Sequence, residues 1–151
     1  MPHVELSLTD GPASPRLRSW QAAGSSLDRW AATVVEANEP CLVINAQAAI
    51  VAASASCAQL IGLSDPAAAH GRQLRDALVP LVDFTAAQAK LDRSEADKIP
   101  PLLAIASGLM ARGLIRLVCP ESNHATTLDA ISTPLVDGGT VVGSLTFFAK
   151  V

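Results

Sequence analysis

Aromatic and charged side chains are scarce in this sequence. Of its 151 residues, 3% are aromatic, none is tyrosine and 17% are charged, with a formal net charge of −3. Proteins that bind nucleic acid through its phosphates need a basic surface, and those that bind single strands by base stacking need exposed aromatic rings. We therefore expect no direct binding to nucleic acid.

Metal-ligand spacing and long apolar runs are also missing, and no signal peptide is expected. The three cysteines, Cys41, Cys57 and Cys119, form no CxxC or CxxH pair, so a structural zinc site or other metal site is not expected. Their apolar neighbours suit free thiols in a reducing compartment. The apolar run at 48–53 is too short to cross a bilayer, and residues 1–10 contain no apolar segment typical of a signal peptide. These features predict a cytoplasmic protein without membrane contact.

Half of the residues are apolar, which is sufficient for one hydrophobic core in a chain of this length. Residues 1–26 are rich in proline, glycine and serine and are predicted to form a flexible lead-in. A helix signal begins at Ser26, a suitable N-cap, and ends at 38–40, because Pro40 disfavours helical backbone in the residue before it. The folded domain is therefore predicted to span 27–151.

Short strand-like and helix-like segments follow this helix. Apolar runs at 41–44 and 50–54 predict an antiparallel hairpin. Short helices are expected at 57–61 and 71–78, and helical spacing at 85–108 is interrupted at Pro100 and Pro101, where a new helix begins. Three more strands are expected at 114–119, 126–135 and 141–151, with a glycine turn at 137–139 between the last two. This order predicts an α+β domain with an antiparallel sheet.

The order and spacing of these segments resemble the PAS family, a sensor module of many bacterial kinases and transcription regulators. The resemblance covers about 27–151 and rests on the segments 36–45 (EANEPCLVIN), 50–56 (IVAASAS), 58–62, 71–76 (GRQLRD) and 130–145. It implies a five-stranded antiparallel sheet, preceded by an N-terminal helix, with short helices on one face and a cavity between them. It also implies a sensory role in signal transduction, with an effector, a transcription regulator or a kinase, that is not present in this chain. The alternative is a protein–protein interaction or dimerisation scaffold of another α+β class, GAF- or roadblock-like, with no ligand.

Several family features are missing, and they limit the cofactors that we expect. Members often carry an aromatic residue and an asparagine after the second strand, where this chain has only small residues at 53–55. The light sensors that form a covalent flavin adduct carry an Asn-Cys-Arg-Phe-Leu-Gln stretch, which is absent. Haem-binding members place a histidine on the helix before the third strand, and 95–108 contains none. Haem and covalent-adduct flavin are therefore not expected, and the cofactor is unknown.

The cavity implied by the family would be lined by aliphatic side chains of the strands and short helices. A small apolar or amphipathic ligand is the hypothesis for its contents, and ordinary core packing is the alternative for every one of these positions. The candidate lining residues are Leu42, Ile44, Leu60, Leu74, Leu78, Leu103, Ile115, Leu117, Leu128, Leu145 and Phe147.

The helix before the first strand carries apolar residues at helical spacing, namely Leu27, Trp30, Ala31, Val34 and Val35. In PAS relatives such a helix packs on its own sheet or pairs with its copy in a dimer. We predict a homodimer through this helix, with packing on its own domain as the alternative.

Catalysis is not expected. Cys57 or Cys119 with His124 as base would supply the residue types of a cysteine hydrolase. The chain contains no phosphate loop, nucleophile elbow or paired catalytic carboxylates. We therefore predict a module that is not an enzyme.

Overall fold

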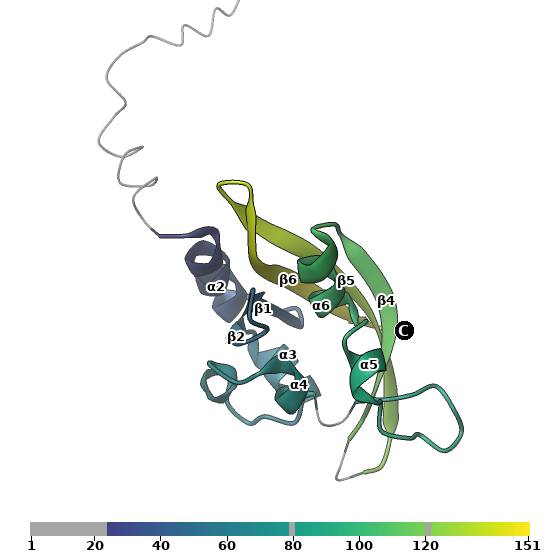
Figure 1. The fold of residues 1–151 in the computed structure, drawn as a ribbon. Helices are drawn as coiled ribbons and strands as arrows, with labels where there is room; N and C mark the ends of the chain where they lie inside the picture. Colours follow the sequence, from purple (N-terminus) through teal and green to yellow (C-terminus); the bar gives the residue numbers. More distant parts are fainter. Residues whose placement is uncertain (1–23, 79–80, 120–121) are drawn as a thin grey trace, which may run out of the picture.

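A computed structural model describes residues 24–78, 81–119 and 122–151. The lead-in predicted for 1–26 therefore falls almost entirely outside the described residues. The described part is an α+β domain built on one antiparallel sheet (Figure 1).

The sheet contains six strands in the order β2-β1-β6-β5-β4-β3, and all neighbours are antiparallel. Five of them correspond to the predicted strands. The sixth, β3, was not predicted, because it is only two residues long and has no alternation of its own. The strands are β1 (Cys41–Asn45), β2 (Ile50–Ala53), β3 (Leu81–Val82), β4 (Ala111–Val118), β5 (Ala125–Asp137) and β6 (Thr140–Lys150).

Short helices connect β2 to β4, and one longer helix precedes β1. They are α2 (Ser26–Glu36), α3 (Ala55–Leu60), the 3₁₀-helix η1 (Pro66–Ala69), α4 (Leu74–Ala77), α5 (Arg93–Ala96) and α6 (Pro100–Ser107). The predicted N-cap of the first helix was wrong by one residue: Ser25, not Ser26, caps α2 in a reciprocal capping box with Asp28. Ser54 caps α3. The segment 85–108, predicted to be helical, forms helices only at 93–96 and 100–107, and residues 85–92 are not helical.

The sheet has two differently covered faces. The inner face packs against α3, η1, α4, α5 and α6, and it contributes Leu42, Ile44, Ile115, Leu117, Leu128 and Phe148 to the larger hydrophobic core. The outer face packs against α2 through Cys41, Val43, Leu135 and Leu145, with Val34 as the one buried residue of the helix. Figure 1 shows α5 and α6 in front of the long strands, and α2 beside β1 and β2.

Two hairpins, β1–β2 at one edge of the sheet and β5–β6 at its centre, are closed by specific turn residues. The Asn45 side chain accepts hydrogen bonds from the backbone N–H groups of Gln47 and Ala49, both at 3.0 Å, which fixes the β1–β2 turn. Gly138 and Gly139 both have positive φ, +57° and +79°, as a two-residue hairpin turn requires between β5 and β6.

Candidate ligand-binding site

The interior below the helices is closely packed. Seven of the predicted cavity residues, Leu42, Ile44, Leu74, Leu78, Ile115, Leu117 and Leu128, are buried in the inner core, and Leu60 packs at its margin. The gap enclosed by Cys57, Leu60, Ile61, Leu78, Ile115, Leu117, Leu128 and Phe148 is too small to hold a water molecule. These residues therefore form a filled core at this place.

Three predicted cavity residues lie elsewhere. Leu145 packs under α2 on the outer face, and Phe147 is 43% exposed on the same face, so placing them in the interior was wrong. Two adjacent phenylalanines lie near the end of β6, and the pairing of Phe147 with Ile131 on the outer face directs Phe148 inward instead. Leu103, on α6, is 42% exposed and lies outside the packed interior.

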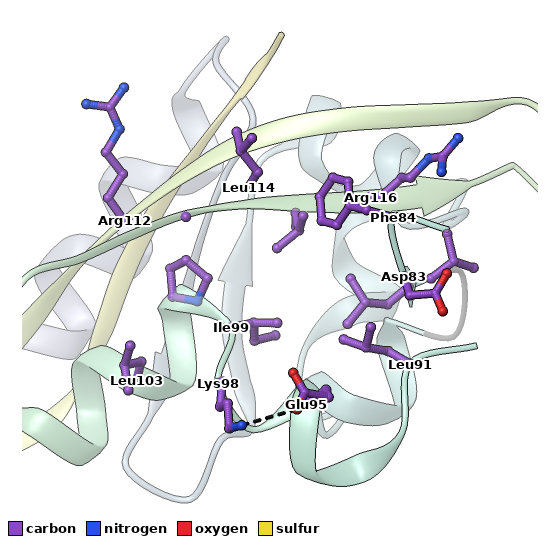
Figure 2. Close-up of a pocket in the computed structure, with 15 residues that line it drawn as sticks. Asp83, Phe84, Leu91, Glu95, Lys98, Ile99, Leu103, Arg112, Leu114 and Arg116 are labelled. Atoms are coloured by element: carbon purple, nitrogen blue, oxygen red, sulfur yellow. Dashed lines mark hydrogen bonds and ion pairs between the residues drawn. The ribbon is translucent and has the colours of Figure 1, made fainter. Parts of the chain in front are cut away.

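An open cavity of about 340 Å³ lies next to this core, where β3 and β4 diverge. We call it the β4-edge pocket. Figure 2 shows Leu103, Ile99 and Lys98 on one side of it and the β4 residues on the other. Its lining comprises Leu81, Val82, Asp83, Phe84, Leu91, Glu95, Lys98, Ile99, Pro100, Leu103 and residues 112–116 of β4. Leu103 and Ile115 are the two predicted cavity residues that line it.

The pocket exists because β3 is short. Along β4, it reaches only Leu117 and Arg116. The strand β4 continues toward Ala111 without a neighbour on that side among the described residues, while it pairs with β5 along its whole length. Gly113 contributes no side chain to the space, and a Cβ placed there would lie 3.4 Å from Pro100 Cγ. The sequence pattern contained no signal for this arrangement, because it depends on where β3 stops.

Charged groups at the rim are mostly satisfied by one another. Lys98 pairs with Glu95 at 3.1 Å, and Arg112 forms a two-pronged ion pair with Asp129 of β5, at 2.6 and 3.1 Å. The hydroxyl of Thr85 donates to Asp83 at 2.6 Å and holds the pKa of that carboxyl below its usual value. Arg116 donates to the Thr85 carbonyl at 3.3 Å.

A second opening of about 390 Å³ lies between the β1–β2 turn and α6. It is a shallower hollow beside the exposed ion pair of Arg75 with Asp97, at 2.6 Å. The β4-edge pocket has more large apolar side chains in its lining, including Leu81, Ile99 and Leu103, and is therefore the stronger candidate site.

Two of the three cysteines, Cys41 and Cys57, are poor candidates for nucleophiles, whereas Cys119 is exposed. Burial raises the pKa of the Cys57 thiol to about 12 and also raises that of Cys41, so both thiols stay protonated at neutral pH. Cys119 and His124 face each other across the β4–β5 turn, where the Cys119 N–H donates to the His124 carbonyl at 3.0 Å. Among the described residues, no group of three or more potential metal ligands converges.

The predicted dimer helix divides into two faces. Val34 is buried, and Leu27 and Ala31 pack with it on the outer face of the sheet, so Val34 is not available to a partner. Trp30 and Val35 are exposed. In the described part of the chain, no helix has the length and apolar character needed to cross a membrane.

Neither a family model nor a curated protein matches the sequence. Solved structures do match it. "VqmA bound to DPO" is 21% identical, with a TM-score of 0.58 over 83% of this chain and 57% of that one. A Vibrio cholerae VqmA dimer is 20% identical, with a TM-score of 0.59 over 83% of this chain and 52% of that one. The PAS domain of a Colwellia psychrerythraea protein is 16% identical, with a TM-score of 0.56 over 83% of this chain and 96% of that one.

The chain therefore has the PAS fold, as predicted, with a sixth short strand added at one edge of the sheet. The alternative of a GAF- or roadblock-like fold is set aside. The chain spans about half the length of the VqmA chains that it matches.

Proposed function

We propose that this protein is a sensory module that binds a small ligand in the β4-edge pocket and relays its presence to an effector. The observation that carries the proposal is the pocket itself. Its volume of about 340 Å³ lies within the range of small-molecule sites, and its floor is formed by Leu81, Ile99 and Leu103 with few polar groups. The structural match to a VqmA that holds a ligand, DPO, supports a sensory role on this fold.

The pocket is connected to the outer face of the sheet through one row of cross-strand partners. Arg112 of β4 lies opposite Ile131 of β5, which lies opposite Phe147 of β6, which lies opposite Cys41 beneath α2. A ligand that shifts β4 would therefore also shift the surface beside α2. We propose this row as the route to the effector, and homodimerisation through the same surface as part of the signal. Catalysis is no part of the proposal.

A pocket-filling substitution tests the ligand site. Gly113→Leu places a large side chain in the cavity without backbone strain, because Gly113 has no positive φ. Ala106→Leu is the matched control, since this exposed residue of α6 lines the other opening. The purified full chain is screened against a library of small metabolites by thermal denaturation.

We expect at least one compound to raise the Tm of the wild type and of A106L but not of G113L. Ligand at 100 times its Kd stabilises a protein by about 2.7 kcal/mol, which is a shift of several degrees for a domain of this size. A compound that stabilises G113L as strongly as the wild type would reject the pocket as the ligand site.

A further inference from the structure

The strand β4 has an open edge beside the β4-edge pocket. The residues on either side of Val82 form backbone hydrogen bonds to 89–91, away from β4. Val82 therefore directs its own N–H and C=O toward β4, where it pairs with Arg116. Because this direction alternates along an antiparallel strand, Arg112 and Leu114 direct their groups to the same side as Arg116. These four backbone groups have no partner among the described residues.

The inner side of this edge is apolar and lacks one side chain. Gly113 places no side chain between β4 and Pro100, and Ile99 and Leu103 form an apolar floor below the strand. Figure 2 shows Leu114 on the opposite side of β4 from Ile99. A strand that pairs with this edge therefore needs apolar side chains on its inner side, with a large one opposite Gly113, where β4 itself supplies none.

The chain contains a segment with this pattern outside the described residues. At 4–9, VELSLT, apolar and polar residues alternate strictly, which is typical of a strand with one buried face. Pro2 precedes the segment and Gly11 and Pro12 follow it, residue types that end a strand. The segment is thus an exception within the lead-in predicted for 1–26. We propose that residues 4–8 add to β4 as an antiparallel strand and cover the β4-edge pocket.

One register uses the whole open edge. With Leu6 opposite Gly113, residues 4–8 pair with 111–115 and stop before Arg116, whose edge β3 already occupies. The three apolar side chains of the segment then face the floor of the pocket, and its two polar side chains lie on the outer face of the sheet. A slip of one residue would place the polar side chains on the floor.

The start of α2 lies within reach of this edge. The Ser26 N–H donates to Asp137 at 3.0 Å, and Ser132, five residues before Asp137, pairs with Ala111. At about 3.3 Å per residue along β5 and about 4.8 Å between strands, the Ala111 end of the edge is about 25 Å away. The 15 residues 10–24 can span about 50 Å. In the antiparallel direction the added strand ends at Ala111, so the linker takes the short way back.

A second copy of β4 fits the same edge less well. Two β4 edges paired over 111–115 would place the two copies of Gly113 opposite each other, so neither copy would supply a side chain there. A tethered segment also has an effective concentration in the millimolar range, whereas a second copy binds only at its own concentration. This inference rests on the proposed function, because it concerns the regulation of the same pocket: a ligand enters by displacing the segment.

Amide hydrogen exchange of the full chain, measured by NMR, tests the added strand. The N–H groups of Arg112 and Leu114 face the segment, whereas that of Gly113 faces β5. We expect Leu6→Asp to speed exchange at Arg112 and Leu114 about tenfold or more and to leave Gly113 unchanged, because a charge on the apolar floor releases the segment. Ser7→Asp, on the outer face, is the matched control and is expected to behave as the wild type.

Exchange at Arg112 and Leu114 that is as fast in the wild type as in Leu6→Asp would overturn the inference. Protection that increases with protein concentration would also overturn it, because a second copy would then cover the edge. A compound that stabilises the wild type but not Gly113→Leu, together with equal exchange in the wild type and Leu6→Asp, would retain the ligand site and reject only the segment. Protected amides without any stabilising compound would retain the segment and reject the ligand.

Discussion

Gly143 is the residue at which the packing of this domain tolerates no side chain. It lies in β6 opposite Asn45 of β1, and a Cβ built there overlaps the Ile44 carbonyl oxygen and lies 2.8 Å from Leu27 Cδ2. Both the β1–β6 ladder and the contact of α2 with the sheet therefore depend on the missing side chain. This is a steric requirement, since Gly143 has no positive φ.

We expect Gly143→Ala to lower the free energy of unfolding by about 3 kcal/mol, at the upper end of the range for overpacking substitutions. Gly113→Ala is the matched control, because its Cβ would meet only Pro100, with Cγ at 3.4 Å. The control is expected to change stability by about 0.5 kcal/mol at most, as is usual for substitutions without a steric conflict. Urea denaturation followed by circular dichroism measures both, and equal stability of the two variants would contradict the steric argument.

At the scale of elements, one hydroxyl joins three segments of the fold. The buried Ser54 side chain accepts hydrogen bonds from the N–H groups of Cys41 and Cys57, at 3.1 and 3.2 Å, and donates to the Glu39 carbonyl at 2.8 Å. It therefore caps α3 and fixes the entry of the chain into β1 at the same time. Ser56 donates to the Asn38 carbonyl at 2.9 Å, and its hydroxyl also lies 3.3 Å from that of Ser54.

Ser54→Ala leaves two backbone donors without this partner, one of them the start of α3. The expected loss of stability is about 2–4 kcal/mol, from the lost cap and the unpaired buried groups. Ser56→Ala, a neighbouring serine with a single backbone partner, is expected to lose about 1 kcal/mol or less. The denaturant midpoints of the two variants are compared. A Ser54→Ala protein as stable as Ser56→Ala would show that water replaces the hydroxyl of Ser54 and would contradict this prediction.

The elements that local chemistry determines could be predicted from the sequence, and those that depend on distant pairing could not. The glycine turn at 138–139 and the hairpin before residue 54 follow from turn residues between apolar runs. The inward direction of Phe148 rather than Phe147 depends on cross-strand register, which no local pattern contains. The β4-edge pocket was missed for a similar reason, since it requires both the early end of β3 and the approach of Pro100 to Gly113.

At the scale of the whole molecule, the two faces of the sheet are closed to different degrees. Helices cover the inner face, whereas α2 covers only part of the outer face. The uncovered part presents Ile131 and Phe147 as directly opposed neighbours, 37% and 43% exposed. The helix α2, which packs on this face, carries Trp30, which is 38% exposed. Exposed apolar side chains that gather on one face are typical of an interaction surface.

A specific interface buries about 800 Å² on each partner, which is more than one turn of α2 can supply. The dimer proposed above would therefore use α2 together with the exposed part of the sheet. We expect the wild-type chain to sediment as a dimer, and Trp30→Glu and Phe147→Asp each to shift it to the monomer, since each places a charge in a desolvated apolar contact. Ala32→Glu, at an exposed position on another side of α2, is expected to remain dimeric.

Sedimentation velocity over a range of concentrations gives the masses, and circular dichroism verifies that each variant is folded. A folded Trp30→Glu protein with the dimer mass would remove α2 from the interface, whereas loss of the dimer in Phe147→Asp alone would place the contact on the sheet.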